Sequence, residues 1–136
     1  MTQEHDIRQA YINTLLDGGF TRLADGSINP TEGYIVGGVI EPTTMYSTCS
    51  PNPTIHYAQF QELWRKYDLQ LDEYTSNLYE AVMGVGTWIY KNRYMSYKIY
   101  FDLVQHISDL DRATEVAKER GEIAIYDCTN QKEILL

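Results

Sequence analysis

The feature that most constrains the fold is a run of apolar residues at helical spacing between residues 54 and 81. Its members follow one another at alternating steps of three and four residues: Tyr57, Phe60, Trp64, Tyr67, Leu71, Tyr74, Leu78 and Ala81. This period predicts an apolar face along a helix, which would be core or, alternatively, a homodimer interface through residues 57–78. Because a long straight rod is unusual in a small domain, and because Asp68 and Asp72 could mark a break, we expect two helices or one bent helix.

A strict alternation of apolar and polar residues follows in residues 94–104. Tyr94, Lys98 and Tyr100 fall on its polar side. A period of two predicts a β-strand with one buried face, and residues 82–90 supply the partner strand of an antiparallel hairpin. With a Lys-Asn-Arg turn at its tip, the hairpin would present a basic, aromatic patch on an otherwise acidic chain.

Shorter patterns predict the remaining elements. The first helix should end at Gly18, since glycine adopts the left-handed conformation common at helix C-termini. Ser108 should cap a later helix, with Asp111 as its partner in the first turn. The predicted elements are a helix over 3–17, strands over 19–23 and 33–40, a capped helical turn at 29–32, a loop over 41–53, a helix over 109–120, and two strands beginning at Ile123 and Glu133 around a turn at 127–130.

These elements predict an α+β fold with a mostly antiparallel sheet and flanking helices, in the order α-β-β-α(α)-β-β-α-β-β. The chain has 136 residues, which is material for a single domain, residues 1–136. The proline-rich loop is the candidate linker between two sub-lobes, residues 1–50 and 54–136.

Glycines in the expected strand over 33–40 indicate an unusual backbone contact. Gly33, Gly37 and Gly38 lie close together there. Glycine inside a strand is typical of a bulge or of a close approach by other parts of the chain. A phosphate-binding loop is not expected, because no helix directly follows these glycines.

Charge and aromatic content indicate which partners the surface would accept. The chain has 11 basic and 19 acidic residues, a net charge of −8, and 12 tyrosines against 3 phenylalanines. Such acidity repels phosphate backbones and acidic lipid, so we expect neither direct nucleic-acid binding nor membrane association. Tyrosine suits interfaces that are partly wet. These features favour a partner protein with a basic surface, although solubility alone also explains the charge.

The sequence contains no residue pattern typical of catalysis or of a cofactor site. The histidines are far apart, and no Cys or His pair has the spacing of a zinc site. Cys49 and Cys128 cannot build a disulfide framework, which favours a cytoplasmic location. Asp102, Asp109 and Asp111 could hold Mg²⁺ in a hydrolase, but the last two are also explained as first-turn helix residues. We therefore expect no enzyme, no metal and no cofactor.

Motifs in the two end segments resemble a group of small proteins from mobile elements. They are Leu15-Leu16-Asp17-Gly18-Gly19, Gly33-Tyr34-Ile35-Val36-Gly37-Gly38, Gly86-Thr87-Trp88, Tyr100-Phe101-Asp102, Ala113 with Ala117, and Ala124-Ile125-Tyr126-Asp127. The arrangement is similar to uncharacterised accessory proteins of phages, plasmids and integrative elements. The resemblance carries over no catalytic residue, and residues 41–81 depart from it. It implies a mobile-element protein that binds and blocks a host factor.

The sequence thus favours a non-enzymatic phage or mobile-element protein, in the host cytoplasm, that binds and inhibits a host protein with a basic surface. Inhibition of antiviral defence, of the anti-CRISPR or anti-restriction kind, is the expected use. The expected partner-binding residues are Tyr94, Lys98 and Tyr100 on the hairpin, and Tyr67 and Tyr74 on the helix if its aromatic face is open. The other hypotheses are a small-ligand or nucleotide-signal binder, using the Tyr and Lys patch, and a homodimeric structural protein.

Overall fold

The computed structural model describes residues 2–47, 53–75, 82–91 and 97–136. This part of the chain holds three α-helices and a seven-stranded, mostly antiparallel sheet, which confirms the expected α+β class. In chain order the elements are α1 (Glu4–Asp17), β1 (Gly19–Leu23), β2 (Tyr34–Val36), β3 (Thr43–Ser47), α2 (Pro53–Thr75), β4 (Val82–Lys91), β5 (Tyr97–Ile107), α3 (Leu110–Glu119), β6 (Ala124–Asp127) and β7 (Lys132–Leu135). Among the described residues, no helix is long and apolar enough to cross a lipid bilayer.

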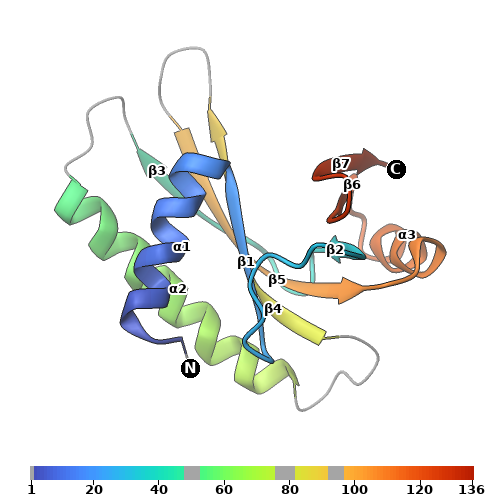
Figure 1. Ribbon diagram of the computed structural model, residues 1–136, viewed down its shortest axis with the longest axis horizontal. Helices are drawn as coiled ribbons and strands as arrows, with labels where there is room; N and C mark the ends of the chain where they lie inside the picture. Colours follow the sequence, from blue (N-terminus) through green and yellow to red (C-terminus); the bar gives the residue numbers. More distant parts are fainter. Residues whose placement is uncertain (1, 48–52, 76–81, 92–96) are drawn as a thin grey trace.

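One sheet runs through the molecule in the order β1-β4-β5-β2-β6-β7, with β3 also paired to β5 (Figure 1). The hairpin of β4 and β5 at its centre was expected from the sequence, and the two strands pair along their whole length. The other edge of β5 is shared by two short strands, since β3 pairs with its first half and β2 with its end. Between them, residues 37–42 leave the sheet beside the middle of β5.

Helices α1 and α2 cover one face of the sheet (Figure 1). The aromatic run of α2 forms the core on this side, and Phe60, Trp64, Tyr67 and Leu71 are all buried. The rings of Phe60 and Phe101, with centroids 4.9 Å apart, join the helix to β5. The described part of the apolar face is therefore closed within the chain, and its burial needs no second copy.

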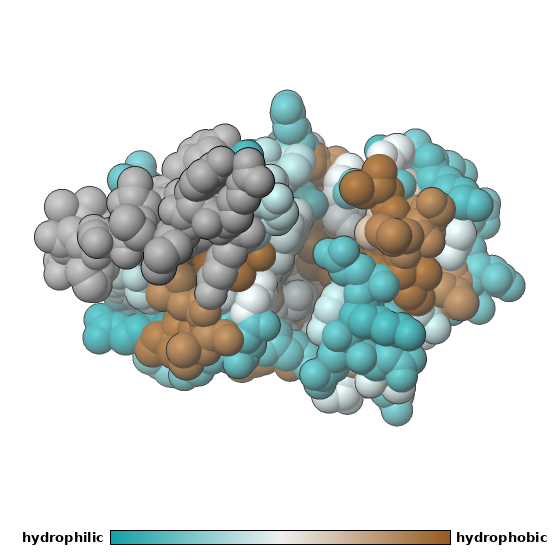
Figure 2. All heavy atoms as spheres, turned by 90° about the horizontal axis from the view of Figure 1, so that it is seen from above, coloured by the Kyte–Doolittle hydropathy of each residue, from teal (hydrophilic) through white to brown (hydrophobic). Residues whose placement is uncertain are grey.

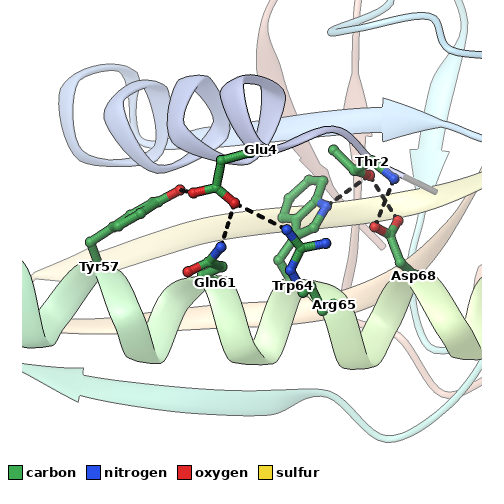
Figure 3. A network of polar contacts seen from close by, with 7 residues as sticks. All are labelled: Thr2, Glu4, Tyr57, Gln61, Trp64, Arg65 and Asp68. Carbon is green, nitrogen blue, oxygen red and sulfur yellow. Dashed lines mark hydrogen bonds and ion pairs between the residues drawn. The ribbon is translucent and has the colours of Figure 1, made fainter.

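Helix α2 is continuous from Pro53 to Thr75, so of the two expected arrangements, two helices or one bent helix, the division into two helices near Asp68 is wrong. Asp68 is buried and binds the start of the chain (Figure 3). Its Oδ2 accepts a hydrogen bond from the Thr2 backbone N–H at 3.0 Å, and its Oδ1 accepts one from the Thr2 hydroxyl at 2.9 Å. Trp64 Nε1 donates to the same hydroxyl at 3.0 Å. The acid is thus used in a tertiary contact and does not end the helix.

A second polar contact ties α1 to α2 one turn further along (Figure 3). Glu4 of α1 accepts hydrogen bonds from the Tyr57 hydroxyl at 3.0 Å and from the Gln61 side-chain amide at 2.5 Å. Its carboxylate also lies 3.0 Å from a guanidinium nitrogen of Arg65. The two helices are therefore aligned by polar contacts at their rim as well as by the apolar core beneath them.

A smaller second core lies between α3 and the far end of the sheet. Ala113, Val116 and Ala117 of α3 pack against Val36 of β2 and Ile125 of β6. The two cores lie on different stretches of the sheet, because on one edge of β5 the strand β3 pairs with its first half and β2 with its end. This arrangement leaves the face opposite α1 and α2 uncovered by helices (Figure 1).

The expected loop over 41–53 is partly wrong, because it contains β3. Thr43 and Thr44 are β-branched or hydrogen-bonding residues that suit a strand, and the first half of β5 offers them a free edge. Residues 43–47 of this segment are therefore part of the sheet. The second expected strand is also shorter than residues 33–40, since β2 ends at Val36.

Two capping expectations are wrong as well. The segment 29–32 is not helical; Asn29 has a φ of 44°, and its side-chain oxygen accepts a hydrogen bond from the Thr21 N–H at 2.9 Å. Helix α3 is capped by Asp109 and not by Ser108, because Asp109 Oδ2 accepts from the Arg112 N–H at 2.9 Å.

Candidate functional site

The face of the sheet that turns away from α1 and α2 is the floor of an open groove with a volume of about 840 Å³. Strands β6 and β7 form one side, and the start of β1 with residues 29–31 borders the other. Figure 2 looks into this hollow from above and shows hydrophobic surface on both of its sides. We name it the acidic groove, for the residues that line it.

Acidic and apolar side chains dominate the lining. The carboxylates are those of Asp17, Asp102, Glu122 and Glu133, and the described part of the lining contains no Lys, Arg or His. The large exposed apolar side chains are Trp88, at 37% exposed, Tyr126 at 40%, Leu135 at 76% and Ile123 at 80%. The groove therefore combines negative charge with uncovered apolar surface.

A glycine, Gly86, lies in the middle of the groove floor. In the register of the sheet, Gly86 of β4 lies between Thr21 of β1 and Asp102 of β5. A Cβ on Gly86 would come within 2.9 Å of Val104 Cγ1, so a methyl group already lies against this glycine. A larger residue at this position would both fill the groove and displace Val104.

An aromatic surface lies next to Gly86 on the groove floor. Trp88 is paired with Gly19 on one side and with Tyr100 on the other. The rings of Trp88 and Tyr100 stack with centroids 5.1 Å apart and an interplanar angle of 7°. Because Gly19 has no side chain, the row across the three strands consists of two stacked rings next to bare backbone.

Asp102 is the most deeply buried acid of the groove, with 1% of its surface exposed. Its Oδ2 accepts a hydrogen bond from the Gly38 N–H at 2.9 Å. Its Oδ1 is buried and has no hydrogen-bond partner within the described chain. A Cβ on Gly37 would lie 3.2 Å from Glu122 Oε1 and even closer to Asp102 Oδ2, so the two carboxylates face each other across this glycine.

This burial has an electrostatic consequence. Desolvation and, to a smaller extent, the negative charge of Glu122 raise the pKa of the Asp102 carboxyl to about 7, against the lowering effects of the Gly38 N–H and of Arg120. Arg120 is held by other acceptors, since it donates to the Gly37 carbonyl at 3.2 Å and to Gln105 Oε1. Near neutral pH, Asp102 is therefore poised between its protonated and ionised forms.

The structure separates the residues that were predicted to bind a partner. Lys98 and Tyr100 alternate with Asp102 on the groove side of β5 and are half-buried. Tyr67 lies under the opposite face, 1% exposed, with its hydroxyl bonded to β3, so the open aromatic face on which its role depended is not found. Tyr94 lies outside the described residues, as does the side chain of Tyr74.

The three acids considered for Mg²⁺ have separate surroundings. Asp102 lies in the middle of β5, whereas Asp109 caps α3 and Asp111 lies exposed in its first turn. Across the residues the structure describes, no three His, Cys, Asp or Glu side chains are grouped so as to hold a metal ion. Cys128 is 3% exposed, and burial raises the pKa of its thiol to about 11, so it is a poor nucleophile near neutral pH.

The sequence held one signal for this site. The close backbone approach expected at Gly37 and Gly38 is confirmed, because both lie against carboxylates. Sequence reasoning did not find Trp88, Glu122 or Tyr126 as lining residues, because their meeting depends on how the sheet curves. Comparisons of this chain with protein-family models, with curated proteins and with solved structures found no match.

Proposed function

We propose that this protein binds a basic segment of a partner protein in the acidic groove and acts by occupying that segment, without catalysing a reaction. The observation that carries the proposal is the lining, which holds four carboxylates and, among the described residues, no basic side chain. A cationic segment would relieve the repulsion among these carboxylates, and complementary charge would speed its association.

Apolar surface supplies the second half of the proposed recognition. Trp88 and Tyr126 are the aromatic members of the exposed lining, and Ile123 and Leu135 extend it along the opposite side. Aromatic side chains at the centre of an interface carry much of the binding energy of protein complexes. A partner segment that alternates basic and apolar residues would match both kinds of surface at once.

The biological use we propose follows from the resemblance to accessory proteins of mobile elements. In that setting the basic partner is a host protein whose cationic surface handles nucleic acid, as defence nucleases do. An acidic protein bound there would block the access of DNA or RNA, since both compete for the same positive charge. The protein would then act as a counter-defence inhibitor in the host cytoplasm.

The charge of the groove weighs against a nucleotide as its occupant, because a phosphate would meet four carboxylates. A nucleotide-binding role would have to use the surface around Lys98 and Tyr100 instead. A thermal-shift measurement against a nucleotide panel separates the two proposals, because ligand binding raises the melting temperature by mass action.

The direct test is a titration with a short fluorescein-labelled peptide in which lysine alternates with leucine, read by anisotropy at low and high salt. We expect binding that weakens with salt, and no binding of the same peptide with glutamate in place of lysine. The double variant Glu122→Gln, Glu133→Gln should weaken it by about tenfold. The matched control is Glu62→Gln, Glu115→Gln, which removes the same charge from exposed positions outside the groove.

Equal loss in both double variants would show that net charge alone attracts the peptide, and the proposal would then be wrong. Equal binding of the lysine and glutamate peptides would contradict it as well. For a host partner, the corresponding measurement is its capture from lysate on the immobilised protein, followed by elution with increasing salt. A partner that stays bound at high salt would contradict the electrostatic part of the proposal.

A further inference from the structure

Asp102 carries an unused hydrogen-bond acceptor at the floor of the acidic groove. The carboxyl is 1% exposed, yet only Oδ2 is engaged, by the Gly38 N–H at 2.9 Å. Oδ1 is buried without a partner in the described chain. An unpaired buried acceptor costs about 1–3 kcal/mol, more when it is charged, so its survival calls for a donor from outside the chain.

The local fold explains why Oδ1 is left over. Thr43 of β3 pairs with Phe101, and Val36 of β2 pairs with Gln105, so the middle of β5 has no strand on that edge. The connecting segment crosses this gap and offers Asp102 one N–H, from Gly38. Among the described residues, the segment offers no second donor for Oδ1.

The charges around Asp102 favour an added cation. On the connection between α3 and β6, the Glu122 carboxylate raises the pKa of Asp102, while Arg120 at the end of α3 lowers it. On the helix side, Tyr67 is the titratable group that interacts with Asp102 through the sheet. Arg120 already donates to Gly37 and Gln105, so the two facing carboxylates retain a net negative charge when both are ionised.

The row of the floor next to Asp102 carries small side chains. Its neighbour across the sheet is Gly86, followed by Thr21, and the Val104 methyl group that lies against Gly86 borders this row. Trp88 stands on the adjacent row, diagonally across from Asp102. A side chain lying along the glycine row would have an indole beside its stem and a buried carboxyl oxygen at its end.

We propose that Asp102 and this row form a subsite for one arginine side chain of the partner segment, with the guanidinium donating to Asp102 Oδ1 and the methylene stem beside Trp88. The inference rests on the proposed function, since it names the residue of the partner that the groove selects. Arginine fits better than lysine because its planar group is more weakly hydrated, stacks on aromatic rings, and spreads several donors over a pair of carboxylates.

Binding at this subsite is coupled to a proton. A cation beside Asp102 favours the ionised carboxylate, so it lowers the pKa of a group that otherwise titrates at about 7. Arginine binding should therefore release a proton below about pH 7 and strengthen as the pH rises towards 8. Glu122 reinforces this coupling, because its charge adds to the larger effect of burial in holding the Asp102 proton in the absence of the ligand.

The experiment uses N-acetyl-arginine methylamide as probe, with the neutral citrulline and the lysine analogues as comparisons, titrated into the full-length protein by calorimetry. Two buffers with different ionisation enthalpies at about pH 6.5 report the released proton. We expect arginine to bind more tightly than lysine, citrulline to bind weakest, and Asp102→Asn to lower arginine affinity by about tenfold or more and abolish the proton release. Glu62→Gln, at an exposed position on α2, serves as control and should change neither quantity.

A second measurement does not depend on a variant. The ¹³C resonance of the Asp102 side-chain carboxyl should titrate near neutral pH, and its midpoint should fall when the arginine probe is added. An unchanged midpoint, equal binding of arginine and citrulline, or unaltered affinity in Asp102→Asn would each overturn the inference. The lysine–leucine peptide separates the two proposals: if it binds and Asp102→Asn has no effect on the arginine probe, the subsite is wrong and the groove proposal stands. If that peptide does not bind while the arginine probe does, the groove proposal fails and the subsite remains.

Discussion

The Gly38 N–H donates to Asp102 Oδ2 across 2.9 Å and so fastens the segment between β2 and β3 to the centre of β5. The bond holds this segment in place where it crosses the middle of β5, a stretch with which neither β2 nor β3 pairs. Its cost is a carboxyl held almost entirely away from water. The same residue therefore organises the fold and gives the acidic groove its most unusual chemical group.

The stability of the protein should depend on pH through Asp102. The folded-state pKa of about 7 lies above the ordinary value of 3.8, so the folded state holds a proton that the unfolded state has lost between these values. This contribution is fully present below about pH 4, declines as the pH rises, and is gone above about pH 7, a total of roughly 4 kcal/mol at most. Urea unfolding of the native chain and of Asp102→Asn at about pH 5 and about pH 8 should show a smaller pH difference in the variant. An equal difference in both would contradict the burial of an ionisable Asp102.

Replacing Asp68 by alanine should destabilise the protein by about 2–4 kcal/mol, because two hydrogen bonds to Thr2 are lost and buried donors remain. Asp68 is 4% exposed, with its acceptor atoms 3.0 and 2.9 Å from the Thr2 donors. Chemical denaturation gives the free energy of unfolding, and Glu62→Ala on the exposed side of the same helix is the control. A loss no greater than in that control would mean that the contact adds little stability.

Two neighbouring glycines of β4 should respond differently to alanine. A Cβ on Gly84 would meet backbone, with the Leu23 Cα at 2.9 Å and the Arg22 carbonyl oxygen closer still. A Cβ on Gly86 would meet a Val104 methyl group, which can rotate or shift. We expect Gly84→Ala to cost about 3 kcal/mol or more and Gly86→Ala about 1–2 kcal/mol, measured by thermal unfolding. The reverse order would be inconsistent with the pairing of β1 and β4.

The Cys128 thiol should be unreactive in the folded protein. It is 3% exposed, and desolvation together with the charge of Asp127 raises its pKa to about 11. In a Cys49→Ser background, a disulfide reagent such as Ellman's should label Cys128 at neutral pH only after denaturant is added. Rapid labelling without denaturant would show that the region around β6 opens readily.

The success of the sequence-based predictions depended on the kind of pattern behind each one. The apolar run of α2, as far as Leu71, and the alternation of β5 were read correctly because each depends on one period along one element, and Phe60 and Phe101 indeed meet in the core. The break near Asp68 was wrong, since a tertiary contact to Thr2 satisfies an acid that local rules place at a helix end. The strand β3 was missed because its residues are weakly patterned and are ordered by a free edge of β5.

By itself, the sequence determined most of the element types, the mostly antiparallel α+β class and the acidic net charge, because these follow from local periodicity and from counting charges. The tertiary structure alone decided that Asp102, Glu122 and Trp88 line one groove and that Tyr67 does not. The physical reason is that local alternation along a strand fixes which face of the sheet a side chain points to. Whether its charge is buried depends on which distant segments cover that face. Here the segment between β2 and β3 gives Asp102 one donor, and the described chain offers none to its second carboxylate oxygen.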